Sequence, residues 1–223
     1  MSMVKSSISL IVLLLILSGC YGSPSAGRPV SINATTVEAV SIDEYLRRGA
    51  AYEIEGRHNA AIRQYRAVID MDALDSRGYF GAGNIYMKTH RYNLAEGAFE
   101  MAIELNPDEG LYYNNLAWVY IETLRPVQAI VTVSMALSLD IERRHVYLNT
   151  LAVASMAIGN YAASEQYLKE AAMIVFPMDI AGQIRIYESL LVLYMRSSDE
   201  AMANMVRGKL FDLRRGIPVM MDF

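Results

Sequence analysis

The stretch that decides the fold reads YFGAGNIYMKTHRYNLAEGAFEMAIELNP and covers residues 79–107. Its large aromatic and small apolar residues recur at intervals of 34 residues on both sides of it. The positions that share this spacing are Tyr45, Tyr79, Tyr113 and Tyr147; Tyr52, Tyr86 and Tyr120; Ala61, Ala95 and Ala129; Gly49, Gly83 and Ala117; and Tyr65, Phe99 and Val133. A fixed period of this length predicts tandem structural units, each of which stacks on its neighbours.

The pattern resembles the tetratricopeptide repeat, and its best single copy runs from Tyr79 through Gly83 and Phe99 to Pro107. The resemblance implies an all-α fold, a right-handed α-solenoid of about four helix pairs with a capping helix pair at its C-terminal end. The expected repeats span about residues 41–74, 75–108, 109–142 and 143–176, and the capping helices with an apolar tail span residues 177–223.

The sizes of the repeated residues indicate how such units pack. Small side chains, such as those of Gly83 and Ala95, let the two helices of one unit approach closely. Large side chains, such as those of Tyr86 and Phe99, fill the space between one unit and the next. Because one helix pair cannot bury its apolar face alone, the stacked neighbours supply the core.

The N-terminus has the pattern of an export signal. Lys5 is followed by an almost uninterrupted apolar run from Ile8 to Leu17. A helix of this length extends about 15 Å, roughly half of the hydrocarbon thickness of about 30 Å. We therefore expect residues 1–19 to be a signal peptide rather than a transmembrane helix.

The signal ends in LSGC, residues 17–20, which resembles the lipobox of bacterial lipoproteins. The resemblance implies cleavage before Cys20 and acylation of this cysteine, which would anchor the chain in a lipid membrane. Residues 20–40 would then form a flexible tether. Tyr21 stands where an aspartate is associated with inner-membrane retention, so we expect a lipid-anchored protein on the periplasmic face of the outer membrane. The alternative is an incidental cysteine at the end of an ordinary signal peptide.

Composition excludes several functional classes. The chain has a formal net charge of −4 and a pI near 5.4, so it lacks the basic character that nucleic-acid binding requires. Its single cysteine excludes an internal disulfide and a cysteine-based zinc site. The histidines His58, His90 and His145 stand apart and form no metal-binding or catalytic motif. We expect no catalytic residues, no metal, no cofactor and no enzymatic activity.

In proteins that carry the tetratricopeptide repeat, the first helix of each unit lines a concave groove. The residues that map to this groove are Phe80, Asn84, Met87, Asn114, Trp118, Ile121, Asn149 and Met156. Asparagine amides can donate to and accept from an extended peptide backbone, and the apolar side chains adapt to a partner. Trp118 and Met87 could instead pack on a neighbouring helix, and the apolar tail from Gly216 to Phe223 could cover the groove.

Some members of this family clamp a C-terminal carboxylate with basic residues and asparagines. Asn84 and Asn115 match the asparagines of that clamp, but Leu46, Val146 and Thr150 occupy its basic positions. The sequence therefore favours an apolar or neutral protein segment as the ligand of the groove.

These features predict a membrane-anchored, non-catalytic scaffold that binds a partner protein in the cell envelope. One role known for lipidated proteins of this family is pilotin-like assistance to the assembly of type IV pili or secretion systems. Another is that of an adaptor for peptidoglycan hydrolases or synthases. A lipoprotein that captures a small ligand in the groove is a third interpretation, and architecture by itself does not choose between them.

Overall fold

The computed structural model describes residues 40–217 and residue 219. The chain divides into two units, Met1–Glu38 and Ala39–Phe223, and every described residue lies in the second unit. The predictions that fall outside the described residues concern the signal peptide, Cys20, the tether up to residue 39, and residues 218 and 220–223 of the tail.

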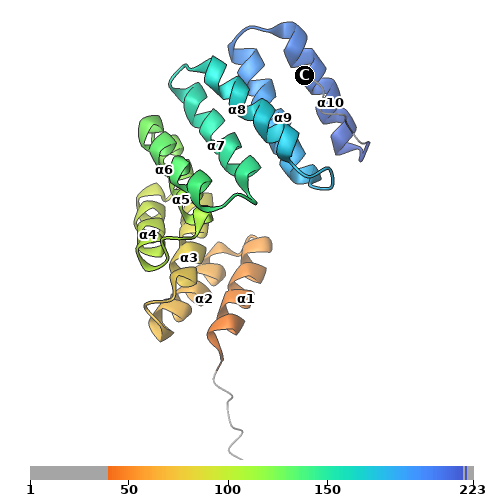
Figure 1. The fold of residues 1–223 in the computed structure, drawn as a ribbon. Coiled ribbons are helices and arrows are strands. Elements are labelled where there is room, and N and C mark those ends of the chain that lie inside the picture. Colours follow the sequence, from red (N-terminus) through yellow and green to blue (C-terminus); the bar gives the residue numbers. More distant parts are fainter. Residues whose placement is uncertain (1–39, 218, 220–223) are drawn as a thin grey trace, which may run out of the picture. The chain divides into compact units, whose positions relative to one another are not determined.

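The described residues form ten α-helices and no β-strand, which confirms the expected all-α solenoid (Figure 1). The helices follow one another as five antiparallel pairs, each joined by a short turn. Their bounds are α1 (Ile42–Ile54) and α2 (His58–Met71), α3 (Ser76–Lys88) and α4 (Tyr92–Leu105), α5 (Gly110–Glu122) and α6 (Pro126–Leu139), α7 (Arg144–Ala157) and α8 (Tyr161–Ile174), and α9 (Ile180–Arg196) and α10 (Glu200–Arg214).

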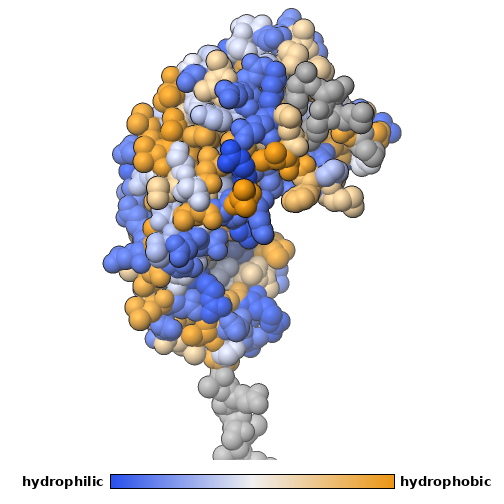
Figure 2. Space-filling model, viewed as in Figure 1, coloured by the Kyte–Doolittle hydropathy of each residue, from blue (hydrophilic) through white to orange (hydrophobic). Residues whose placement is uncertain are grey.

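The first helices of successive pairs form the inner side of this unit. The backbones of α1 and α3, α3 and α5, α5 and α7, and α7 and α9 approach closely, whereas no two second helices come as close in the described part of the chain. The first helices approach one another more closely than the second helices do. The solenoid therefore curves toward the side of the first helices. Their row therefore lies on the concave side, and the space-filling view shows a hollowed side of the unit (Figure 2).

The repeated large residues form successive layers of the core. Tyr65, Phe99 and Val133 occupy the same position in α2, α4 and α6, and none of them is more than 5% exposed. The alanines of the period are fully buried in the same helices, at Ala61, Ala95 and Ala129. The spacing of 34 residues is therefore a spacing of core positions.

In each of the first three helix pairs, the turn between the two helices carries an arginine that stacks on a tyrosine of the first helix. The guanidinium carbons of Arg57, Arg91 and Arg125 lie 4.4, 4.7 and 4.6 Å from the ring centres of Tyr52, Tyr86 and Tyr120. The residues just before these arginines have positive φ angles, namely Gly56, His90 and Leu124. Cation–π contacts of this kind contribute about 0.5–1 kcal/mol at exposed sites. They give a second reason, besides core packing, for the recurring tyrosine.

Glycines let two first helices meet the ring of Tyr65 at close range. A Cβ atom added to Gly81 would lie 2.3 Å from Cε1 of Tyr65, and one added to Gly49 would lie 2.7 Å from the same atom. The Tyr65 hydroxyl donates a hydrogen bond to Glu53 Oε2 over 3.1 Å. Burial, and to a smaller extent the nearby Glu53 carboxylate, raises the pKa of Tyr65 well above its ordinary value. The hydroxyl therefore keeps its proton and remains a donor.

Alanine substitution at two helical glycines is expected to have opposite effects. Gly81→Ala should lower the free energy of unfolding by about 1–3 kcal/mol, because the new methyl group must displace the Tyr65 ring. Gly97→Ala in α4 should raise it by about 0.5–1 kcal/mol, because nothing lies within 4 Å of the added Cβ and alanine favours the helix. Urea unfolding followed by circular dichroism measures both, and changes of the same sign would contradict the packing described here.

Candidate binding groove

The residues expected to line the groove lie on three first helices at different depths. Asn114, Asn149 and Met156 are buried, and the other five are partly exposed. By helix, α3 carries Phe80, Asn84 and Met87, α5 carries Asn114, Trp118 and Ile121, and α7 carries Asn149 and Met156. All three helices belong to the concave row.

Asparagines on neighbouring helices bond to one another. Asn115 Nδ2 donates to Asn84 Oδ1 over 2.8 Å, and Asn114 Nδ2 donates to Asn115 Oδ1 over 3.2 Å. Thr150 Oγ1 donates to Asn114 Oδ1 over 2.8 Å. A chain of hydrogen bonds thus runs from α3 through α5 to α7. Both polar atoms of the Asn114 amide are bonded within the solenoid.

Three apolar residues of the predicted groove form part of the solenoid wall. The ring centre of Phe80 lies 4.7 Å from that of Tyr112 and 5.9 Å from that of Phe99. Met87 packs against the same cluster, and Ile121 packs against the core of the next unit. These side chains are partly buried in the wall, so only part of their surface can face a partner.

Met156 lies deeper than a groove residue would. It is 4% exposed and belongs to the core cluster that joins α7 to α8, α9 and α10. Only an edge of this side chain is left to face a ligand, because α9 packs over α7 at this point.

Asn149 has a different environment from Asn114. It is 8% exposed, and its buried Oδ1 atom has no hydrogen-bond partner among the described residues. A buried oxygen without a partner costs about 1–3 kcal/mol. A ligand N–H group that reached Asn149 Oδ1 would offset this cost.

Trp118 lies where two cavities adjoin. The smaller cavity, of about 60 Å³, is lined by Trp118, His145, Val146, Asn149, Thr150, Gly182, Arg185 and Ile186. The larger cavity, of about 280 Å³, is lined by Trp118, Asn149, Val153, Met156, Arg185, Glu188, Ser189 and Val192. Because Trp118, Asn149 and Arg185 line both, we treat the two cavities as one site and call it the Trp118 hollow.

The Trp118 hollow combines apolar walls with a few polar groups. Val153 and Val192 line it together with the indole of Trp118. Arg185 brings a cation that forms no ion pair with any described residue. The hollow can therefore hold an apolar side chain, accept an N–H group at Asn149 and bind a carboxylate or carbonyl oxygen at Arg185.

Helix α9 supplies residues that the repeat pattern did not predict. Arg185, Ser189 and Val192 of this helix line the hollow. Their spacing of four and three residues puts them on one helix face, and this spacing is the signal that the sequence offered. The sequence of the last helix pair, α9 and α10, matches the repeat poorly, so it did not show which face of α9 turns inward.

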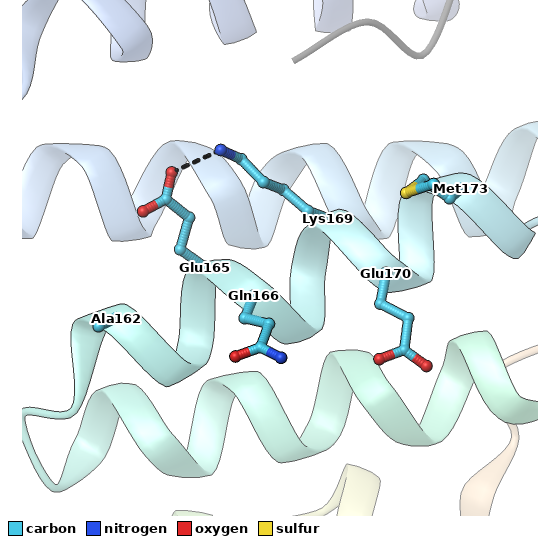
Figure 3. Close-up of a pocket in the computed structure, with 6 residues that line it drawn as sticks. All are labelled: Ala162, Glu165, Gln166, Lys169, Glu170 and Met173. Carbon is cyan, nitrogen blue, oxygen red and sulfur yellow. Dashed lines mark ion pairs between the residues drawn. The ribbon is translucent and has the colours of Figure 1, made fainter.

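A second hollow beside α8 is a weaker candidate. Figure 3 shows the residues that line it, Ala162, Glu165, Gln166, Lys169, Glu170 and Met173, all from α8. Lys169 Nζ lies 3.0 Å from Glu165 Oε1, and Arg144 Nη2 lies 2.8 Å from Glu170 Oε1. Since its charged groups are already paired and one helix forms its wall, this hollow offers little to distinguish a ligand.

The described part of the chain shows neither a metal centre nor a membrane span. No cluster of three or more His, Cys, Asp or Glu residues in it could hold a metal ion. None of its helices is both long and apolar enough to cross a bilayer.

Comparisons of the sequence with known proteins point to the repeat. Residues 76–109 and residues 45–73 each match the tetratricopeptide repeat family. Tetratricopeptide repeat protein 6 from Homo sapiens is 28% identical over 86 residues, which cover 39% of this chain and 16% of that protein. This chain thus spans only a small part of the length of that relative.

Comparisons of the fold point to the same architecture. PilW, a widely conserved type IV pilus biogenesis factor, superposes with a TM-score of 0.70 at 16% identity, over 78% of either chain. PilF from Pseudomonas aeruginosa superposes with a TM-score of 0.62 at 20% identity, over 79% of this chain and 78% of PilF. At these identities the likeness shows the fold alone.

Proposed function

We propose that this chain, which matches the tetratricopeptide repeat over residues 45–73 and 76–109 and folds as an α-solenoid, binds a segment of a partner protein on its concave surface at the Trp118 hollow. The repeat is a protein-interaction scaffold, and the first helices supply the surface. The observation that carries the proposal is the unpartnered Asn149 oxygen, buried beside a half-buried tryptophan in one concave hollow.

The hollow suits an extended peptide in three ways. An apolar side chain can pack on the indole of Trp118 and on Val153. A backbone N–H group can donate to Asn149 Oδ1, which satisfies a buried acceptor. Arg185 and Ser189 can donate to backbone or side-chain oxygens of the same segment.

We further propose a non-catalytic envelope protein, anchored by acylated Cys20 at the periplasmic face of the outer membrane. The apolar run that ends in LSGC at residues 17–20 supports the anchor. The shared fold with PilW, a type IV pilus biogenesis factor, supports a role in assembling a type IV pilus or a related secretion system. The partner would then be a protein of that assembly.

Trp118→Ala is expected to weaken peptide binding at least about tenfold, because a buried aromatic anchor carries a large share of binding energy. The probe is a fluorescein-labelled peptide selected on the unsubstituted chain from a library of short random peptides, and anisotropy measures its affinity. The free energy of unfolding should fall by much less than the roughly 3–5 kcal/mol lost when a core aromatic is truncated.

Two further variants control this experiment. Trp118→Phe keeps an aromatic ring in the hollow and should retain most of the affinity. Leu94→Ala removes an exposed side chain on α4, outside the hollow, and should leave the affinity unchanged. Unchanged binding in Trp118→Ala would refute the proposed site, and a loss of stability as large as that of a core aromatic would assign Trp118 to the core.

A further inference from the structure

Resting on the proposed function, we infer that the partner segment is acidic as well as apolar, and that it crosses α9 from the Trp118 hollow to an arginine-lined hollow on α10. The sequence favours a neutral ligand because the repeats carry no basic residue at the clamp positions. The structure places cations on the end pair, α9 and α10, instead.

The hollow between α9 and α10 has an apolar floor. Its volume is about 540 Å³, and we call it the Phe211 hollow. The residues that line it are Glu188, Leu191, Val192, Arg207, Leu210, Phe211, Arg214 and Arg215. Phe211 is 59% exposed, and an exposed aromatic ring beside aliphatic side chains in a concavity is typical of a protein-binding anchor site.

The two hollows share a wall. Glu188 and Val192 of α9 line both of them. A helix with its side chains is about 10–12 Å wide, so about three or four extended residues are enough to cross it. One short segment can therefore occupy the Trp118 hollow and the Phe211 hollow together.

Arginines surround this continuous surface. Arg185 lines the Trp118 hollow, and Arg207, Arg214 and Arg215 line the Phe211 hollow. Arg214 Nη2 lies 2.8 Å from Glu188 Oε1, so these two side chains form an ion pair with each other. Among the described residues that line either hollow, Glu188 is the only carboxylate against four guanidinium groups.

The other three arginines have no carboxylate partner in the described part of the chain. Arg207 Nη1 donates to Asn204 Oδ1 over 2.6 Å, and the guanidinium carbon of Arg215 lies 5.2 Å from the ring centre of Phe211. These contacts orient the two side chains without neutralising them. A positioned guanidinium group is a strong bidentate donor to a carboxylate.

The positive charge is concentrated at the two hollows and does not extend over the whole end of the chain. The repeats, residues 41–176, contain 12 basic and 17 acidic side chains, whereas residues 177–223 contain six of each. An acidic segment would therefore be attracted to the arginines of the two hollows and repelled by the repeats. Such complementarity sets the position of a partner and disfavours basic competitors.

A protein segment fits this surface better than an anionic membrane does. The apolar side chains that would anchor a ligand line two hollows rather than a projecting face. A peptide can enter a hollow and reach its floor, whereas a bilayer presents a flat surface. We therefore assign the acidic ligand to a protein.

The charge composition of selected peptides tests this inference. Panning a library of short random peptides on the purified full-length chain should enrich sequences that combine Asp or Glu with large apolar residues. The double variant Arg207→Glu/Arg215→Glu should bind a selected acidic peptide at least about tenfold more weakly, because two charge-assisted contacts become repulsive. Added salt should weaken binding to the unsubstituted chain.

Matched variants separate this local effect from net charge. The double variant Arg63→Glu/Arg66→Glu on α2 makes the same change of charge at two exposed arginines that line neither hollow, and should leave the affinity nearly unchanged. A peptide with Lys in place of its Asp and Glu should prefer the double variant to the unsubstituted chain. Circular dichroism should show the same helix content in all variants.

Each contrary outcome has a distinct meaning. Neutral or basic selected peptides that still require Trp118 would overturn the acidic partner and leave the proposed groove standing, whereas the absence of any selected peptide would overturn both. Binding to vesicles of anionic lipid that depends on Arg207 and Arg215, without peptide binding there, would replace the protein partner by a membrane. Tighter peptide binding in Asp222→Asn would mean that the chain's own tail occupies the surface, which also overturns the inference.

Discussion

Phe99→Ala is expected to lower the free energy of unfolding by about 3–5 kcal/mol. Phe99 is fully buried in α4, and an added Cβ at Gly83 would lie 2.6 Å from Cε1 of its ring. Leu116 and Val119 of α5 belong to the same core cluster. The ring therefore joins three helices from two units, and no shift of a single helix can close the cavity that its removal leaves.

Leu94→Ala on the same helix is the matched control. Leu94 is 52% exposed, so its truncation should change the free energy of unfolding by no more than about 0.5 kcal/mol. Urea unfolding monitored by circular dichroism measures both variants. A loss at Leu94 as large as that at Phe99 would show that α4 packs with another face toward the core.

Cys20→Ala is expected to abolish labelling of the protein by fatty acid and to release it from the membrane fraction. Each buried CH₂ group of an acyl chain contributes about 0.8 kcal/mol to membrane binding, so two or three chains make a durable anchor. The mature chain would have 19 basic and 24 acidic side chains after loss of Lys5, and this charge gives no attraction to anionic head groups. Metabolic labelling and membrane fractionation measure the two effects.

Ser18→Ala provides the control for the anchor, because it keeps Cys20 and a small residue in the signal. This variant should be labelled and fractionated like the parent. Fatty-acid labelling that persists in Cys20→Ala would exclude the lipoprotein interpretation. An unlabelled parent chain, exported and released, would identify an ordinary signal peptide with an incidental cysteine.

The site shows how far periodicity can predict a binding surface. The spacing of residues along a helix assigns each side chain to a face, and this placed Trp118 and Asn149 on the concave row. The spacing does not show how deeply each side chain is buried. Asn114 is bonded to Thr150 of the next unit, and Met156 lies in the core beneath α9, because neighbouring helices cover them.

The contacts of some arginines could have been predicted from the sequence, and those of others could not. Arg57, Arg91 and Arg125 follow the period of 34 residues, so their stacking on the repeated tyrosines was open to prediction. Arg185 and Arg207 belong to the end pair, which departs from the repeat. Their meeting around two joined hollows required the packing of α9 against α7 and α10.

The sequence by itself determined the helical repeat, because its period follows from local spacing and residue size. Only the tertiary structure decided which inward residues stay open to a partner and where charge gathers. Burial at Met156 and the cationic surface around Phe211 depend on contacts between helices that are distant along the chain, and no periodic pattern encodes such contacts.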